Sequence, residues 1–360
     1  MARVVVAMSG GVDSSVAALL LRERGHDVVG LFLRNGAHAA PRSRGDAHRQ
    51  GCCSIEDARD ARAVAAALGV PFYALDFSAE FGALIDRFVG EYRRGRTPNP
   101  CALCNRDLKL GALLSFARSI GAEAVATGHY ARAERRDGRM RLRRGVDRAK
   151  DQSYVLAPVE PAALERAIFP IGELAKPEVR EHARRAGLPV AEKRESQEIC
   201  FVPTNDYRDL LRERGVAGTP GRIVDREGGV LGEHAGFEGF TVGQRRGIGV
   251  AAPAPLYVTS IDPQTATVVV GERPDLLRSW IECDSVGWLG ADPPSPGERR
   301  ACEVQIRAHH VAVPATVAAA GAGVRIEVAA PLDAAAPGQL AVLYEGDVVA
   351  GSAWIDRAGR

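Results

Sequence analysis

The chain has 360 residues, of which 46% are hydrophobic and 26% charged, and its formal net charge is +2. This composition excludes an intrinsically disordered protein and a small disulfide-stabilised one, and the length suggests about two to three domains. No apolar run reaches the ~18 residues that a membrane-spanning helix needs, and the N-terminus is not typical of a signal peptide, so we expect a soluble, cytoplasmic protein without a membrane partner.

The first half of the chain alternates short apolar runs with helical patterns. Strands are predicted at Val4–Met8, Asp27–Leu33, Pro71–Asp76 and Glu123–Thr127, and helices at Ser14–Arg24, Ser54–Leu68 and Leu108–Ser119. Strands that alternate with helices indicate an α/β domain with a Rossmann-like parallel sheet covered on both faces. The polar stretch Gly36–Gly51 has no periodicity and is predicted to be a loop that could act as a lid.

The second half of the chain has a different character. Helical patterns at Pro161–Ala167 and Lys176–Ala186 are followed, from about Gly218, by dense glycines and prolines. Short strand-like runs occur at Gly221–Val224, Leu256–Ile261, Thr267–Val270, Arg300–Arg307, Val324–Ala329, Leu340–Tyr344 and Val348–Ile355. We therefore predict an α/β domain at residues 1–205, a small β-rich linking domain at 206–285 and a C-terminal β-barrel at 286–360.

The string Ser9-Gly10-Gly11-Val12-Asp13-Ser14 lies between the first predicted strand and helix. Adjacent glycines let the backbone turn tightly and present its N–H groups, and a helix N-terminus adds a positive dipole end. The string is neither a Walker A loop nor a GxGxxG motif. It predicts a phosphate-binding loop, in which Asp13 shapes the loop and is at most linked to Mg²⁺.

Basic residues are concentrated in two places, Arg132–Lys150 and Arg93–Lys109. A solvated arginine-rich surface explains either stretch alone, and two stretches beside one candidate site favour a polyanionic partner. The chain also has seven cysteines, an odd number, and a disulfide framework is not expected in the cytoplasm. Cys104, close to the N-terminus of a predicted helix, is expected to have a lowered thiol pKa, whereas Cys283 and Cys302 are predicted to be inert.

Further strings accompany the loop in a fixed order. They are Thr97-Pro98-Asn99-Pro100 ahead of Cys101 and Cys104, Ala126-Thr127-Gly128-His129-Tyr130, Lys150-Asp151-Gln152-Ser153-Tyr154, Ser196-Gln197-Glu198-Ile199-Cys200-Phe201 and Thr241–Gly247. The glycine loop resembles the PP-loop of the ATP pyrophosphatases. With the other strings, the chain resembles the tRNA-specific 2-thiouridylase family over essentially its whole length.

The resemblance implies a reaction and a set of roles. ATP would adenylate O2 of the wobble uridine in tRNAs for Lys, Glu and Gln, and a persulfide on Cys200 would deliver sulfur to C2 with release of AMP and pyrophosphate. Cys104 corresponds to the family's nucleophile, which cleaves or resolves the persulfide and could then form a disulfide with Cys200. The implied partners are tRNA and a cysteine desulfurase or sulfur-relay protein, and Mg²⁺ is expected with ATP.

The same resemblance assigns binding residues by position. The ATP site would comprise Ala7, Met8, Ser9, Gly10, Gly11, Val12, Asp13, Ser14, Leu33 and Gly128. The target base would face Asn99, Pro100 and Cys101, and other parts of tRNA would contact His129, Lys150, Asp151, Gln152, Arg307, Ala308 and Gln339. No metal-ligating residue is predicted.

One position departs from the family pattern. Many members carry an acidic residue where this chain has Cys101, so the general-base role of that position is open. Three thiolates, on Cys101, Cys104 and Cys200, would also permit an iron–sulfur cluster, and Cys52, Cys53, Cys101 and Cys104 a zinc site, although persulfide chemistry is favoured. Outside this family, the alternatives are another PP-loop ligase and a non-enzymatic, redox-sensing RNA-binding module.

Overall fold

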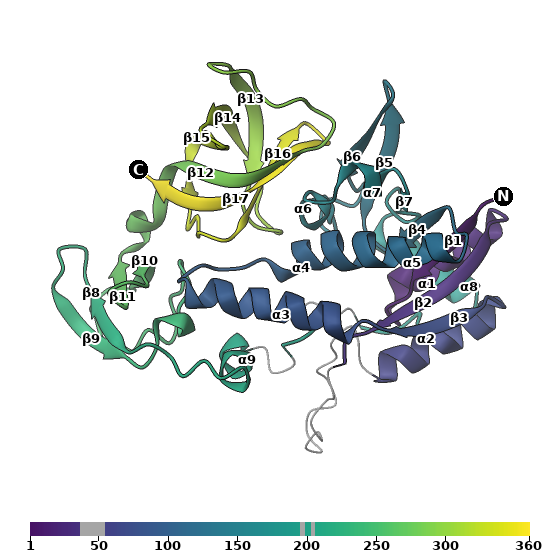
Figure 1. Cartoon of the computed structure of the whole chain (residues 1–360), viewed down its shortest axis with the longest axis horizontal. Coiled ribbons are helices and arrows are strands. Elements are labelled where there is room, and N and C mark those ends of the chain that lie inside the picture. Colours follow the sequence, from purple (N-terminus) through teal and green to yellow (C-terminus); the bar gives the residue numbers. More distant parts are fainter. Residues whose placement is uncertain (37–54, 195–198, 203–205) are drawn as a thin grey trace. The chain divides into compact units, whose positions relative to one another are not determined.

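The structure, a computed structural model, describes residues 1–36, 55–194, 199–202 and 206–360 (Figure 1). The contacts divide the chain into two compact units. The first contains Met1–Leu84, Cys101–Asp206 and Asp347–Val349, and the second contains Ile85–Pro100, Tyr207–Gly346 and Ala350–Arg360. Among the helices in these described ranges, none is long and apolar enough to cross a membrane.

A five-stranded parallel sheet forms the centre of the first unit. In spatial order, its strands are β3 (Phe72–Asp76), β2 (Asp27–Arg34), β1 (Arg3–Ala7), β4 (Ala124–Thr127) and β7 (Ala167–Ile168). β1 and β4 are neighbours, although the chain forms β2 and β3 between them. The strand order therefore reverses between β1 and β4, and open parallel sheets bind ligands outside the carboxyl ends of the strands at such a reversal.

Helices cover the sheet, as the alternation of patterns predicts. They include α1 (Val12–Glu23), α2 (Ile55–Leu68), α5 (Leu113–Ser119), α6 (Ser153–Leu156), α7 (Pro161–Leu164) and α8 (Lys176–Arg185). Residues of α1, α2 and α8 form one apolar cluster with Val4 and Val6 of β1. Val5, which points to the opposite face of the strand, is also fully buried, so both faces of β1 are covered.

The helix that carries Cys101 and Cys104 is longer than predicted and irregular. α4 (Pro100–Leu103) continues into a π-helix, η1 (Cys104–Ala112), and then into α5. The predicted start at Leu108 is therefore wrong: the helix begins at Pro100, whose missing N–H is not needed in a first turn. π-helical segments are rare and occur frequently at functional sites.

A β-hairpin that the sequence prediction does not contain follows β4. β5 (Ala131–Arg136) and β6 (Arg139–Arg144) pair antiparallel around Asp137 and Gly138, which have φ values of 52° and 78°. Two positive φ angles are required by a type I′ turn, and an Asp-Gly pair is a strong signal for it. The predicted helix at Pro161–Ala167 is also wrong at its end, because α7 stops at Leu164 and Ala167 begins β7.

The second unit is rich in β-structure, as predicted. One sheet contains β10 (Tyr257–Asp262), β11 (Thr267–Gly271), β8 (Gly221–Val224) and β9 (Val230–His234). Six further strands are β12 (Leu277–Trp288), β13 (Arg299–Gln305), β14 (Val313–Ala320), β15 (Gly323–Asp333), β16 (Leu340–Glu345) and β17 (Val348–Gly359). Pairing of β12 with both β15 and β17 closes these six into a barrel.

Four further helical segments lie in the second unit or lead into it. α3 (Ser78–Arg93) begins in the first unit and ends in the second, while α9 (Tyr207–Glu213), η2 (Phe237–Gly239) and η3 (Arg273–Leu276) belong to the second. β12 runs through the predicted domain boundary at 285/286, and the three-domain division stays a prediction. The predicted lid lies outside the described residues, apart from Gly36.

Candidate active site

The glycine loop lies at the carboxyl end of β1 and leads directly into α1. The Ser9 backbone N–H donates to Ser14 Oγ at 3.1 Å, and Ser14 Oγ donates to the Gly11 carbonyl oxygen at 3.2 Å. Gly11 is the N-cap of α1 and supplies no side-chain cap to the first-turn amides. These N–H groups lie at the positive end of a helix dipole, so the loop has the geometry of an anion-binding site.

The carboxylate of Asp13 is engaged by two buried side chains. Lys176 Nζ lies 2.7 and 2.8 Å from the two carboxylate oxygens, and the Tyr130 hydroxyl donates to Oδ1 at 2.7 Å. Lys176 and Tyr130 are only 8% and 3% exposed. Protein donors therefore already engage both carboxylate oxygens. The predicted loop-shaping role of Asp13 stays a prediction that these contacts favour. This arrangement does not favour Asp13 as a magnesium ligand.

Gly128, at the carboxyl end of β4, lies against the same loop. A Cβ atom at this position would be 2.5 Å from the Ser14 nitrogen, so only glycine permits this close approach. The structure thus brings Gly128 together with residues 7–14, as the ATP-site prediction requires. Leu33 lies in β2, two residues after Leu31, which pairs with Ala7 in the sheet register. No described contact joins Leu33 to the loop.

His129 is buried rather than exposed at the edge of the sheet. The Nδ1 atom of His129 lies 2.6 Å from Thr127 Oγ1, and the imidazole ring packs edge-on against the ring of Phe169. Burial, together with the nearby charge of Lys109, lowers the pKa of His129 well below its usual value. The imidazole is therefore neutral at pH 7, and its predicted contact with tRNA remains a prediction that its burial does not favour.

The cysteines of the candidate site differ in exposure. Cys101 in α4 is exposed, whereas Cys104, the first residue of η1, and Cys200, in a turn, are partly buried. Residues three apart on a helix share one face, so Cys101 and Cys104 lie on the same side. Within the described residues, no three His, Cys, Asp or Glu side chains are gathered as metal ligands. Cys52 and Cys53, invoked for a zinc site, lie outside the described residues.

Asn105, next to Cys104, is almost completely buried. Its amide nitrogen donates to the Val155 carbonyl oxygen at 3.2 Å, which fixes the orientation of the side chain. The amide oxygen is buried and has no hydrogen-bond donor among the described residues. A buried acceptor of this kind is unusual in a folded protein, so the neighbourhood of Cys104 retains unused hydrogen-bonding capacity.

Asp151 and Gln152, both predicted to contact tRNA, stabilise the chain after β6. Asp151 accepts hydrogen bonds from the backbone N–H groups of Gly145 and Ser153 and forms an ion pair with Arg144 at 3.1 Å. Gln152 Oε1 accepts from the Tyr130 backbone N–H at 3.0 Å. These contacts give both residues structural roles, and the predicted contacts of Lys150, Asp151 and Gln152 with tRNA stay predictions.

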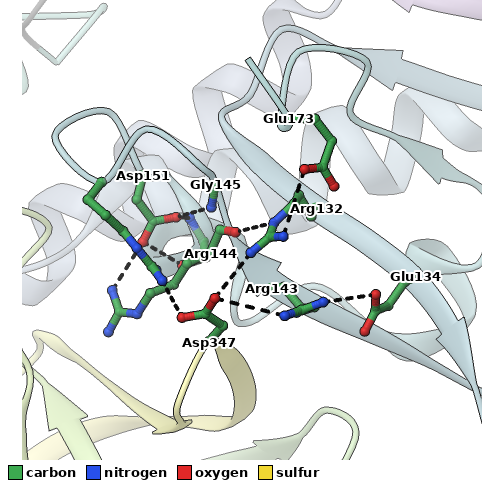
Figure 2. A network of polar contacts seen from close by, with 10 residues as sticks. Arg132, Glu134, Arg143, Arg144, Gly145, Asp151, Glu173 and Asp347 are labelled. Carbon is green, nitrogen blue, oxygen red and sulfur yellow. Dashed lines mark hydrogen bonds and ion pairs between the residues drawn. The ribbon is translucent and has the colours of Figure 1, made fainter. Parts of the chain in front are cut away.

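Arginines of the predicted basic stretch form an internal network with carboxylates (Figure 2). Asp347 accepts from Arg132 at 3.2 Å and from Arg148, and it lies 3.8 Å from Arg143. Arg143 is also paired with Glu134 at 3.0 Å. Hydrogen bonding from Arg148, followed by the charges of Arg132 and Arg143, lowers the pKa of Asp347 in spite of burial. Much of the positive charge of this stretch is therefore neutralised within the protein.

In the second unit, Gln339 supports the segment that precedes the cysteine motif. Its amide nitrogen donates to the carbonyl oxygens of Thr97 and Pro98 at 3.0 and 3.2 Å. The Thr97 N–H donates in turn to the Pro337 carbonyl oxygen at 2.7 Å. Arg307 donates to the Ala334 carbonyl oxygen at 2.9 Å, and Gln305 holds the carbonyl groups of Arg307 and Ala308.

Comparison with known proteins gives three consecutive family matches. They are a family described as "tRNA methyl transferase HUP domain" at residues 2–204, a "tRNA methyl transferase PRC-barrel domain" at 208–272 and an "Aminomethyltransferase beta-barrel domain" at 278–355. The tRNA-specific 2-thiouridylase MnmA of Geobacter metallireducens is 49% identical over 359 residues, covering 99% of this chain and 97% of that protein. The chain belongs to the tRNA-specific 2-thiouridylase family.

Other relatives agree with this membership. The tRNA-specific 2-thiouridylase MnmA of Mycolicibacterium paratuberculosis is 49% identical over 368 residues, covering 99% of this chain and all of that protein. Among solved structures, a 4-thiouridine synthetase–RNA complex with bound ATP is 16% identical with a TM-score of 0.38, covering 59% of this chain and 50% of that one.

For a member of the thiouridylase family, the structure adds residues that sequence reasoning missed. Lys176 and Tyr130, which hold Asp13, and Lys193, which contacts Gly10, are not among the predicted site residues. Tyr130 stands in the quoted ATGHY string and Lys176 begins a predicted helix, but neither string indicates a contact with Asp13. Such contacts join positions more than a hundred residues apart, and one sequence carries no signal for them.

Proposed function

We propose that the chain catalyses the ATP-dependent 2-thiolation of the wobble uridine of tRNA. The observation that carries this proposal is the Ser9–Ser14 loop at the strand reversal, in a chain that matches 2-thiouridylases over 99% of its length. The tRNAs for Lys, Glu and Gln are the proposed substrates. A cytoplasmic location stays a prediction.

The first half-reaction would activate the base. The N–H groups at the start of α1 and the hydroxyls of Ser9 and Ser14 would bind the phosphates of ATP. Attack of uracil O2 on the α-phosphorus would form O2-adenylated uridine and release pyrophosphate. This step converts a poor leaving group into AMP, so the ring carbon becomes open to substitution by sulfur. Mg²⁺ would accompany ATP through the phosphate oxygens, because Asp13 is engaged by Lys176 and Tyr130.

The second half-reaction would transfer sulfur. The terminal sulfur of a Cys200 persulfide would attack C2, and the bond between C2 and O2 would break as AMP leaves. The Cys104 thiolate would then attack Cys200 Sγ, which cleaves the sulfur–sulfur bond and leaves 2-thiouridine and a Cys104–Cys200 disulfide. A thiol reductant would restore both cysteines, and a cysteine desulfurase or relay protein would reload Cys200.

Persulfide transfer by a 2-thiouridylase is favoured over an iron–sulfur cluster, over a non-enzymatic RNA-binding module and over another PP-loop ligase. An iron–sulfur cluster on Cys101, Cys104 and Cys200 finds no support, because these residues do not form a three-ligand group in the described chain. A non-enzymatic RNA-binding module is not favoured, because it gives no reason for a phosphate-binding loop at the strand reversal. Other PP-loop ligases would have the same phosphate-binding loop. They are less favoured because this chain matches a 2-thiouridylase over 99% of its length.

A single-turnover assay tests the proposal. Protein freed of bound metal and loaded with persulfide is mixed with ATP, Mg²⁺ and an unmodified tRNA transcript, and 2-thiouridine and AMP are both measured. We expect equal amounts of the two products from the wild type and no 2-thiouridine from Cys200→Ser, with tRNA binding retained. Cys302→Ser is the matched control, since burial raises the pKa of that barrel thiol to about 11. Thiolation by Cys200→Ser would remove Cys200 from the reaction.

A further inference from the structure

The ammonium group of Lys193 contacts the glycine loop from the side of α2. Lys193 Nζ lies 3.0 Å from the Gly10 carbonyl oxygen, 2.7 Å from Asp57 Oδ1 and 2.5 Å from Asp60 Oδ2. An ammonium has three N–H donors, so these acceptors use all of them. The side chains of Lys193 and Asp57 are 14% and 2% exposed, so little water competes for the contacts.

Lys193 is itself held in place and stays charged. Arg180 of α8 donates to the carbonyl oxygens of Ala191 and Lys193 at 2.8 and 3.2 Å. Although burial opposes the charged form, hydrogen bonds from Lys193 to Asp57 and Asp60 raise the pKa of Lys193 above its usual value. The lysine is therefore a fixed, protonated donor behind the loop.

Gly10 has no freedom to move away from this donor. Its φ angle is +76°, and a Cβ atom there would lie 2.3 Å from the Asp57 carbonyl oxygen. The Gly10 peptide is thus confined between the first turns of α2 and the Lys193 ammonium. Because both helices α1 and α2 begin here, this one peptide links their N-termini.

The orientation of this peptide decides where the next N–H points. The described chain contains no cis peptide bond, so the Gly10 carbonyl and the Gly11 N–H point in opposite directions. With the carbonyl bonded to Lys193, the Gly11 N–H points away from it. Gly11 is the N-cap of α1, and no described protein group accepts a hydrogen bond from its N–H.

We propose that Lys193, together with Asp57 and Asp60, is a positioning residue that fixes the Gly10–Gly11 peptide and presents the Gly11 N–H to the phosphates of ATP. This inference rests on the proposed function, in which the loop binds ATP. It adds that Lys193, which precedes Cys200 by seven residues in the sequence, sets the geometry of the nucleotide site.

The test compares the binding of ATP with the binding of adenosine. The double variant Lys193→Met, Asp57→Asn removes the ammonium without leaving an unpaired buried carboxylate. We expect the Kd for ATP to rise about tenfold, the order of one hydrogen bond to a charged acceptor, and the Kd for adenosine to stay unchanged. Both constants are measured on the full-length protein by equilibrium titration, alongside the melting temperature.

A matched control lies close by in the sequence. Arg184 and Glu192 form an exposed ion pair at 2.7 Å, and Arg184→Met, Glu192→Gln removes the same kinds of charge away from the loop. We expect this control to bind ATP and adenosine like the wild type. Wild-type ATP affinity in the Lys193 variant would overturn the inference, and so would an equal loss for both ligands with a lower melting temperature. A wild-type protein that bound no ATP would overturn the proposed function as well.

Discussion

The neutral imidazole of His129 makes the stability of the first unit depend on pH. Burial lowers its pKa in the folded state, whereas the unfolded chain has the ordinary value of about 6.5. The unfolded state therefore binds more protons as the pH falls, so this contribution to stability is complete above about pH 6.5 and is lost below it.

We expect the melting temperature of the wild type to fall between pH 7 and pH 5 more steeply than that of His129→Gln. The glutamine keeps a polar group beside Thr127 but cannot titrate. Thermal unfolding of both proteins in one buffer series checks this. Parallel curves would mean that other groups cause the pH dependence. His310→Gln is the comparison. Partial burial and the charge of Arg307 lower the pKa of His310 less far than full burial lowers that of His129, so we expect a smaller effect from this variant.

Two roles for Gln339, contact with tRNA and support of the backbone at Thr97 and Pro98, can be distinguished by one variant. The family resemblance implies a contact of Gln339 with tRNA, whereas its amide nitrogen donates to the carbonyl oxygens of Thr97 and Pro98. If this support is its role, Gln339→Ala should lower the single-turnover thiolation rate by about tenfold, the order of two neutral hydrogen bonds, and leave the Kd for tRNA unchanged. A higher Kd for tRNA with an unchanged rate would instead favour the predicted contact.

At the scale of elements, the β5–β6 hairpin changes the interpretation of the basic stretch. Arg144 and Asp151 form a pair with side chains only 15% and 7% exposed, and Arg143 is paired with Glu134. Neutralising such arginines leaves a buried carboxylate without its partner. Charge that is already paired inside the protein also releases few counterions when a polyanion binds.

We therefore expect Arg143→Gln, Arg144→Gln to lower the free energy of unfolding by about 1.5–3 kcal/mol and to change the salt dependence of tRNA binding little. Arg245→Gln, Arg246→Gln is the matched comparison, because these two adjacent arginines are exposed and form no ion pair in the described chain. Denaturant unfolding and tRNA titrations over a salt series measure both effects. A flatter salt slope for the first variant alone would restore the polyanion interpretation.

The elements themselves were predictable to different degrees. Buried β-branched runs such as Val4–Met8 predict the parallel strands to within a residue or two, because such a strand is apolar on both faces. α3 is absent from the prediction although Phe81, Leu84, Ile85, Phe88 and Val89 recur at helical spacing. The hairpin is absent although Asp137-Gly138 signals it. Both α3 and the hairpin could thus be predicted from local sequence signals, whereas the contacts of Lys193 and Gln339 depend on the folded topology.

At the scale of the whole molecule, neither compact unit is one continuous stretch of chain. Residues 85–100 belong to the second unit, where Tyr92 stacks on Tyr207 with ring centroids 4.2 Å apart. Asp347, near the end of the sequence, belongs to the first unit and pairs with its arginines. A cut between the predicted first and second domains would therefore remove partners from both sides of the cut.

We expect a fragment of residues 1–205 to melt at a lower temperature than the full-length protein and to expose apolar surface. It keeps the parallel sheet but lacks Tyr207 and Asp347. Circular dichroism melts and dye binding, with the full-length chain as reference, measure this. A fragment as stable as the whole protein would show that those contacts contribute little.

The hydrogen bonds from Gln339 to Thr97 and Pro98 also bear on how the protein is made. Ribosomes add about 5–20 residues per second, so roughly ten to fifty seconds separate the synthesis of Thr97 from that of Gln339. During that interval the backbone ahead of Cys101 and Cys104 has no access to its eventual support. The segment that leads to Cys101 and Cys104 is thus completed only after Gln339 has been synthesised, and until then it is exposed to oxidants and to chaperones.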